Sequence, residues 1–520
     1  MRKGTLLFLL LTFASQFAIG QNEADLSVIT RIRQEATENS QVMELAYQLT
    51  TLNGPRLTGS PGCRSAENRA RKTLEEWGMS NVALERWGTF GKSWENTHTY
   101  IAMSSPYYQP LIGIAKPWTG STEGQVTGVP LLVSIDDEAD MEKYKGQLKG
   151  KMIMVDSDPD DDLNFEADAS RFTDEDLDGK LENSLLGDGS GHNYTPEQIA
   201  RYRKRRKLNR KLRLFYIEEG VGVILSKRRG DMGTVFTSSA SGFKTGTEAG
   251  VPEIEMASEH ANRIIRLLRD SQEVKVEVHI TNDILESDTT EYNVIAEIPG
   301  SDKKLKSEVV MLGGHLDSWH GGTGATDNGA PCAVMMEVMR IIKTLDLKPK
   351  RTIRLALWTG EEQGLYGSKG YVKEHFADPD KMDLKPEHGK LSAYYNLDNG
   401  AGMIRGIYLQ GNDAARPLFE SWFAPFKDLG AETISINNTG YTDHVAFDNV
   451  GLPGFQFIQD PLEYSSRTHH SNMDTYERLS ESDMIQSVII ITSLVYHTAM
   501  LDKKMPRKPL PEAKTRTTFH

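Results

Sequence analysis

The second half of the chain alternates between short apolar runs and amphipathic stretches. Apolar runs of strand length cover residues 309–312, 353–359, 393–397 and 455–458. Between the first two runs, Val334, Val338 and Ile341 fall on one face of a helix. Continuous apolar strands that alternate with helices are typical of a mostly parallel sheet covered on both faces. The pattern therefore predicts an α/β fold for residues 286–501.

The first half shows two other patterns. From residue 22 the spacing predicts helices on either side of the turn-rich NGPRLTGSPG, and apolar alternation then predicts strands up to about Ile114. Short β-rich runs with Gly and Pro between them, such as VTGVPLLVSI and EGVGVILS, follow. We therefore expect a discontinuous α/β domain, 21–117 and 286–501, interrupted by a β-rich insert domain, 118–285. The Lys-, Arg- and Pro-rich tail, 502–520, is predicted to be disordered.

The N-terminus has the features of a secretory signal peptide, residues 1–20. A basic start precedes the apolar stretch from Leu6 to Phe13, and small residues predict cleavage near Gly20–Gln21. No later run of 18 apolar residues follows, so no transmembrane segment is expected. The prediction is a secreted or periplasmic protein.

Charge and cysteine content narrow the function further. The formal net charge of −13 over 520 residues argues against nucleic-acid binding. The only two cysteines, Cys63 and Cys332, are read either as separate buried thiols or as one bridge.

A charged excursion, residues 157–213, opens acidic and turns basic. We interpret it as a solvated segment whose halves neutralise each other. Asp174, Asp176 and Asp178 match the start of a calcium-binding loop, but Leu185 stands where the bidentate Glu belongs. The basic run is alternatively suited to an anionic surface.

Imidazoles and carboxylates follow the apolar runs of the α/β domain. The candidates are His315, Asp327, Glu361, Glu362, Asp398 and one of His469 and His470. Ligands of open α/β sheets bind beyond the carboxyl ends of the strands, so these residues are expected to meet at one edge.

Their chemistry predicts a metal centre. Imidazole and carboxylate without thiolate suit zinc, and also cobalt or manganese. Three ligand carboxylates leave two divalent cations at +1, which a bridging hydroxide neutralises, so two metals are favoured over one. Such a pair would lower the pKa of its bound water and polarise a carbonyl group.

The neighbours of these ligands have distinct expected roles. Adjacent Glu361 and Glu362 point in different directions, so one can bind metal while the other acts as general base. Asp317 is expected to fix the tautomer of His315, and Asp474 to do the same for the later histidine.

As a set, the motifs resemble the family 28 metallopeptidases, most closely their carboxypeptidase Q group. The resemblance covers GPRLTGSPG, GGHLDSW, TDNG, TGEEQGLYGS, NLDNGAG and HHSNMDT. It implies an α/β domain with a mixed central sheet, and a protease-associated insert domain.

The resemblance also implies roles for individual residues. Asp327 would bridge two Zn²⁺ ions, His315 and Asp398 would complete one site, and Glu362 and His470 the other. His470 is selected over His469 because it lies four residues before Asp474. Glu361 would be the general base, Tyr441 would stabilise the oxyanion, and His444 would be structural. A cis peptide is expected at Asp327–Asn328.

The resulting expectation is a co-catalytic dinuclear zinc exopeptidase that hydrolyses short peptides through a metal-bridging hydroxide. Aminopeptidase, dipeptidase and carboxypeptidase activity remain open, and so does a homodimer. Glutaminyl cyclisation, which a related fold performs with one zinc, is opposed by the full five-ligand set. A non-catalytic binding ectodomain is expected to have lost ligands, and none is missing.

Overall fold

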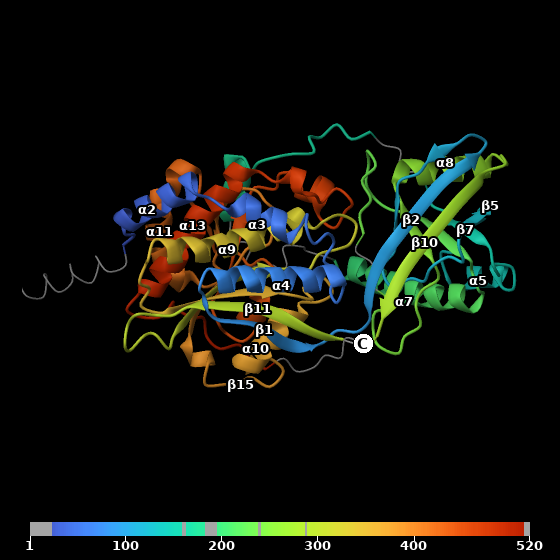
Figure 1. Ribbon diagram of the computed structural model, residues 1–520. Helices are drawn as coiled ribbons and strands as arrows, with labels where there is room; N and C mark the ends of the chain where they lie inside the picture. Colours follow the sequence, from blue (N-terminus) through green and yellow to red (C-terminus); the bar gives the residue numbers. More distant parts are fainter. Residues whose placement is uncertain (1–22, 159–162, 182–194, 238–240, 287–288, 514–520) are drawn as a thin grey trace, which may run out of the picture.

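The computed structural model describes residues 23–158, 163–181, 195–237, 241–286 and 289–513. The predicted signal peptide, 1–20, and Leu185 lie outside these ranges. Two lobes are visible, a larger one around a long sheet and a smaller one around β2 and β10 (Figure 1).

An eight-stranded mixed sheet forms the centre of the larger lobe. Its order is β1 (Ser80–Thr89), β11 (Thr290–Ile298), β13 (Thr352–Trp358), β12 (Val309–His315), β16 (Leu391–Asn396), β19 (Gly454–Gln459), β17 (Ile404–Tyr408) and β18 (Thr433–Ser435). The four strands β13, β12, β16 and β19 are parallel to one another. At one side β11 pairs antiparallel with β13 and β1 antiparallel with β11; at the other β17 pairs antiparallel with β19 and β18 parallel with β17. The parallel centre and mixed edges confirm the predicted fold class.

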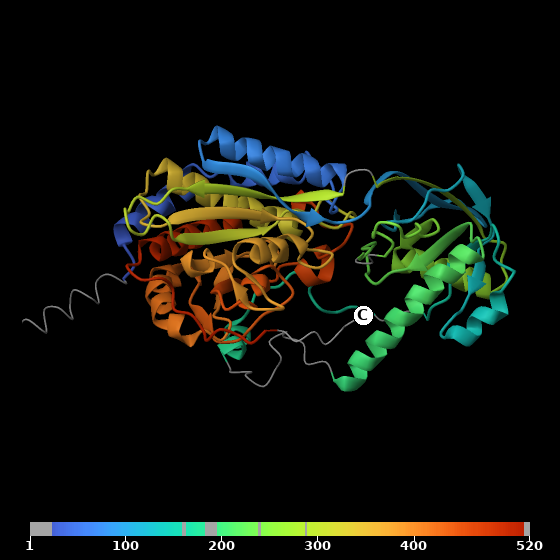
Figure 2. The ribbon, with the colours of Figure 1, turned by 90° about the horizontal axis from the view of Figure 1, so that it is seen from below.

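Helices cover both faces of this sheet, which Figure 2 shows nearly edge-on. One face packs against α2 (Leu26–Glu38), α3 (Val42–Leu49), α4 (Pro61–Glu76), α9 (Ala330–Thr344), α11 (Arg416–Phe423) and α13 (Glu481–Met500). The other packs against α10 (Tyr366–His375) and α12 (His444–Asp448). Burial from both sides explains the continuous apolar runs of the central strands.

The smaller lobe contains two further sheets. One has the order β3 (Gln109–Pro110), β2 (Ser93–Ser105), β10 (Lys275–Leu285) and β5 (Val126–Gly128). The other has the order β4 (Gly113–Ala115), β9 (Glu253–Met256), β8 (Val223–Lys227), β7 (Met152–Val155) and β6 (Leu131–Val133). The helices of this lobe are α5 (Glu138–Tyr144), α7 (Pro196–Glu218) and α8 (Ser258–Arg269).

The boundaries of the insert domain stay a proposal, as does its likeness to a protease-associated domain. The pairing of β2 with β10 along its whole length favours a first boundary near residue 92 instead of residue 117.

The acidic half of the charged excursion returns to the larger lobe. Residues 163–173, which we call the strap, lead to α6 (Asp174–Leu181), where the carbonyl of Lys180 accepts hydrogen bonds from Ser435 Oγ and Asn437 Nδ2. The calcium-loop hypothesis is wrong, because its aspartates lie on this helix instead of in a loop. The basic half forms the long helix α7, visible along the smaller lobe in Figure 2.

Residues 502–513 pack against the larger lobe, so the prediction of a disordered tail is wrong for this part. Met505 is buried, and its N–H donates to Ser392 Oγ. The Arg507 guanidinium donates to the carbonyl of Leu391. Composition alone did not predict these contacts, because the charged side chains of residues 502–513 bind backbone carbonyls.

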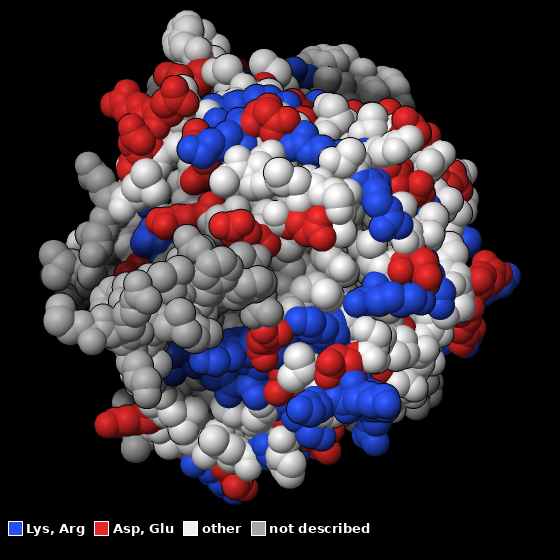
Figure 3. Space-filling model, turned by 90° about the vertical axis from the view of Figure 1, so that its left-hand side faces the viewer, with Lys and Arg blue, Asp and Glu red and all other residues white. Residues whose placement is uncertain are grey.

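Three global expectations can be compared with the structure. Cys63 and Cys332 are both buried free thiols, so they are not bridged. Among the described residues, no helix is long and apolar enough to cross a membrane. On the face in Figure 3, acidic and basic side chains are interspersed.

Candidate metal centre

The candidate ligands meet at the carboxyl edge of the parallel strands. His315 ends β12, Glu361 and Glu362 follow β13, and Asp398 follows β16. Asp327 lies in the turn Ala325–Gly329, which precedes α9, and His470 follows the turn Tyr464–Thr468 after β19. The structure therefore brings all the candidate metal ligands together at one edge of the sheet.

Asp327 lies between two histidines. Its Oδ1 is 3.3 Å from His315 Nε2, and its Oδ2 is 3.2 Å from His470 Nε2. His315 Nε2 is also 3.3 Å from Asp398 Oδ1, and His470 Nε2 is 2.9 Å from Glu362 Oε2. The site thus has two halves that share one carboxylate. The peptide bond after Asp327 is cis, as expected.

Acidic groups are unusually concentrated here. In the described part of the chain, seven buried carboxylates lie in or beside the cluster: Asp317, Asp327, Glu361, Glu362, Asp398, Asp443 and Asp474. Beside them the structure describes the positive groups Arg56, His315 and His470. Burial of so many like charges is costly unless cations neutralise them.

The pKa values of the cluster reflect the same excess of negative charge. Burial raises the pKa of Glu362 to about 7, and it raises the pKa of Glu361 well above its ordinary value. Burial alone would lower the pKa of His470, but the carboxylates of Glu362 and Asp327 outweigh it and raise the pKa to about 10. Asp327 Oδ2 and Glu362 Oε1 are buried without a hydrogen bond. The donor set and its uncompensated charge fit divalent cations of the zinc type.

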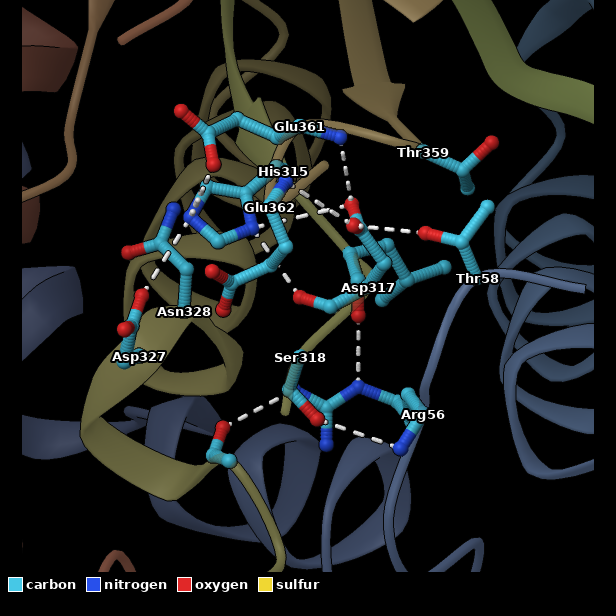
Figure 4. A network of polar contacts seen from close by, with 12 residues as sticks. Arg56, Thr58, His315, Asp317, Ser318, Asp327, Asn328, Thr359, Glu361 and Glu362 are labelled. Atoms are coloured by element: carbon cyan, nitrogen blue, oxygen red, sulfur yellow. Dashed lines mark hydrogen bonds and ion pairs between the residues drawn. The ribbon is translucent and has the colours of Figure 1, made fainter. Parts of the chain in front are cut away.

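Asp317 is placed to fix the tautomer of His315, as predicted, but through its backbone carbonyl, since its carboxylate Oδ1 is 3.7 Å from His315 Nδ1 (Figure 4). His315 Nδ1 donates to the backbone carbonyl of Asp317 at 2.9 Å, which leaves Nε2 for the site. The Asp317 carboxylate instead accepts the N–H groups of Glu361 at 3.2 Å and Glu362 at 3.3 Å, and the hydroxyl of Thr58 at 2.9 Å. The tautomer is therefore fixed by backbone, and the carboxylate orients the two glutamates.

The predicted role of Asp474 is wrong. Its carboxylate accepts the N–H groups of Thr326 at 2.6 Å and Asp327 at 3.1 Å, and it does not orient His470. Asp474 therefore holds the turn that carries the shared ligand. Burial raises its pKa to about 7.

The sequence reasoning missed Arg56 as a functional residue. It is fully buried, and its guanidinium donates to the carbonyls of Leu316 at 2.6 Å, Thr323 at 2.6 Å and Gly324 at 2.8 Å (Figure 4). It thereby braces the loop between His315 and Asp327. The available signal was an arginine inside the turn-rich NGPRLTGSPG.

His469 lies beside the cluster, more remote than His470. Its Nε2 is 3.8 Å from Asp327 Oδ2, and its ring centroid is 3.8 Å from that of His470. Burial, reinforced by His470, lowers the pKa of His469 to about 4. It is a neutral imidazole at the rim of the site.

Two other candidates lie in the loop before α12. Tyr441 is 68% exposed and has a positive φ of 66°. His444 is buried and its Nε2 lies 3.0 Å from the carbonyl of Thr439, a contact of the kind expected for a structural residue. Asp443, between them, is a buried carboxylate that the sequence reasoning did not single out; burial raises its pKa to about 7.

Comparison with known proteins gives a consistent result. Residues 293–495 match the profile of Peptidase family M28. The chain is 26% identical to carboxypeptidase Q of Mus musculus over 467 residues, 87% of this chain and 84% of that protein. A peptidase M28 precursor from Shewanella amazonensis SB2B superposes with a TM-score of 0.65 at 25% identity, covering 94% of this chain and 98% of that one. BSAP, a zinc aminopeptidase from Bacillus subtilis, shares the fold, with a TM-score of 0.54 and 19% identity over 88% of this chain and 94% of that one.

Proposed function

We propose that the chain, which matches the Peptidase family M28 profile over residues 293–495, is a zinc metallopeptidase and, more specifically, a co-catalytic dinuclear exopeptidase that hydrolyses short peptides. The observation that carries the proposal is the Asp327 carboxylate between His315 and His470, inside a cluster of buried acids. His315 and Asp398 would hold one zinc ion, His470 and Glu362 the other, and Asp327 both. When bound, the ions would supply Lewis-acid activation of the substrate carbonyl and of water.

Glu361 is the proposed general base. Its backbone N–H donates to the Asp317 carboxylate. Its Oε2 is 3.9 Å from His315 Nε2, so the side chain borders the cluster without lying between the two histidines. Glu361 takes a proton from the attacking water and passes it to the leaving amine. Tyr441, on the exposed loop before α12, is proposed to donate its hydroxyl to the developing oxyanion.

For the polarity of the exopeptidase, we propose recognition of a free substrate carboxylate. Arg229 of the smaller lobe is exposed, and its guanidinium lies 3.9 Å from the centre of the Phe236 ring. The backbone of Phe236 pairs with Ser471, the residue after His470. Among the described residues no acid forms an ion pair with Arg229. A guanidinium that acts electrostatically on His469 and has no ion pair within the described part of the chain is suited to bind a carboxylate.

A peptide panel tests the activity and the polarity together. The zinc-loaded protein is expected to bind two zinc ions per chain and to cleave N-blocked peptides with a free carboxyl end. Carboxyl-terminal amides of the same peptides should be cleaved poorly. A requirement for a free amine, with amides tolerated, would make the protein an aminopeptidase. One zinc ion per chain without hydrolysis would contradict the exopeptidase proposal and favour a cyclase or a binding protein.

The contribution of Arg229 is tested by Arg229→Gln. We expect KM for free-acid peptides to rise about tenfold or more, since a charge-assisted hydrogen bond contributes roughly 1.5–3 kcal/mol. KM for the amides should not change. Arg210→Gln, which removes an exposed arginine of α7 in the same lobe, is the matched control. An equal change for acids and amides would refute the assignment.

Export is the remaining part of the proposal. A secreted or periplasmic location with cleavage near Gly20–Gln21 is checked by determining the N-terminal sequence of the protein recovered outside the cytoplasm.

A further inference from the structure

The loop that carries His470 is hydrogen-bonded to the smaller lobe. Thr237 N–H donates to the His470 carbonyl at 2.7 Å, and the backbone of Phe236 pairs with that of Ser471. Asn472 extends the pairing, because its side-chain oxygen accepts the Val235 N–H at 2.7 Å. A metal ligand of the larger lobe is thus held in place by backbone of the smaller one.

Arg467 extends this attachment three residues before His470. It is only 5% exposed, and its guanidinium donates to Thr234 Oγ1 at 2.9 Å, to the Asp231 carbonyl at 2.8 Å and to the Asp231 carboxylate. The same guanidinium donates to Asp168 Oδ2 on the strap at 2.6 Å. A planar guanidinium with five N–H groups can hold several acceptors in fixed directions, which an ammonium group cannot.

The strap is itself fixed to the larger lobe, so Arg467 does not hold a loose segment. Arg171 forms ion pairs with the buried carboxylates of Asp460 at 2.9 Å and Asp483 at 2.8 Å. Ser170 N–H donates to the Leu462 carbonyl at 3.1 Å. Asp168 is therefore presented to Arg467 from a segment anchored within three residues of it.

The other half of the candidate site is supported differently. His315 is oriented by the carbonyl of Asp317, and the Asp398 carbonyl accepts Gln456 Nε2 at 2.9 Å. These partners belong to the larger lobe. His470 therefore differs from the ligands of this half, because its loop is held by contacts from the smaller lobe.

We propose that Arg467 is a positioning residue for His470, through which the smaller lobe and the strap hold the His470–Glu362 half of the metal site. The inference rests on the proposed dinuclear site. It predicts that loss of the Arg467 contacts weakens one zinc ion and leaves the ion at His315 and Asp398 bound. A residue that only stabilised the fold would weaken both halves or neither.

The test is zinc binding by Arg467→Gln, measured at equilibrium in buffered free zinc with metal analysis. The wild-type protein should bind two ions, and the variant should bind one with unchanged affinity and the other about 10- to 100-fold more weakly, the range for residues that orient metal ligands. Arg467→Lys should recover little of the lost affinity, because lysine keeps the positive charge but lacks the planar guanidinium. Arg478→Gln removes a partly exposed arginine eight residues after His470, paired with Glu463, and is the control that should bind both ions normally.

Two partner variants keep the test decisive if Arg467→Gln does not fold. Asp168 and Asp231 have side chains that are 30% and 46% exposed, so Asp168→Asn and Asp231→Asn should be tolerated. Each should weaken the same zinc ion, by less than Arg467→Gln. Normal binding of both ions by these variants, or equal weakening of both ions, would overturn the proposal.

The outcomes also separate this inference from the proposed function. A wild-type protein that binds two zinc ions but hydrolyses no peptide would refute the exopeptidase and leave the role of Arg467 standing. An active wild-type protein whose Arg467→Gln variant keeps both ions would refute only the role of Arg467.

Discussion

Replacement of Asp317 by Asn tests how the two glutamates are oriented. The Asp317 carboxylate is fully buried and accepts three hydrogen bonds, from Glu361 N–H, Glu362 N–H and the Thr58 hydroxyl. Oδ2 accepts two of them and Oδ1 the third. An asparagine oxygen can retain the two at Oδ2, but its NH₂ group then faces the Glu361 N–H. One buried donor is left without an acceptor.

The cost follows from these contacts. Each retained bond loses its charge assistance, about 1 kcal/mol, and an unsatisfied buried donor costs about 1–3 kcal/mol. The sum is a loss of about 3–5 kcal/mol in the free energy of unfolding. In the metal-free protein this loss is opposed, because removal of one negative charge relieves repulsion among the buried carboxylates. The zinc-loaded protein should therefore show the larger effect.

The assay is urea unfolding of Asp317→Asn and wild type at a fixed free zinc concentration, together with kcat and KM. Because Glu361 would lose its main-chain anchor, we expect kcat to fall more than KM changes. Asp346→Asn, at a side chain that is 78% exposed, is the matched control. A loss of less than about 1 kcal/mol with unchanged kcat would refute the assigned role.

Three further predictions concern single side chains. Glu361→Gln should lower kcat by about 10²- to 10⁴-fold while zinc content stays at two ions, and normal activity would exclude Glu361 as the base. Tyr441→Phe should lower kcat by about 10²-fold with little change in KM, and an unchanged kcat would remove it from the mechanism. Burial raises the pKa of Glu67 to about 7 from an ordinary 4.5, so the folded state binds the proton more tightly and stability falls by about 3 kcal/mol as pH rises between these values. Glu67→Gln should remove that part of the pH dependence, as measured by urea unfolding at pH 5 and pH 8; an unchanged slope would contradict it.

The central strands were predictable because the sheet buries both of their faces. The apolar runs at 309–312, 353–359, 393–397 and 455–458 correspond to β12, β13, β16 and β19. A strand buried on both sides is apolar at most of its positions, and the sequence shows such a run directly. The carboxyl ends of these strands then located the candidate ligands.

The long-range pairings were not predictable in the same way. Paired residues of β2 and β10 are between 170 and 192 positions apart, and the partly exposed pattern of each strand does not specify a partner. The same limit applies to Asp317 and Asp474. Their carboxylates were expected to bind imidazoles, but most of their donors are backbone N–H groups, which every residue except proline possesses. The residue types in the sequence therefore do not predict such a contact.

Phe236 takes part in both proposals that concern the smaller lobe, substrate recognition by Arg229 and the positioning of His470. Its buried ring supports the Arg229 guanidinium, and its backbone pairs with Ser471 beside His470. The group proposed to recognise the substrate and the loop proposed to hold one zinc ion are therefore joined through a single residue. A displacement of this lobe would change substrate binding and metal binding together. The two proposals together therefore make the smaller lobe a contributor to the candidate site, through substrate recognition and through the loop of His470.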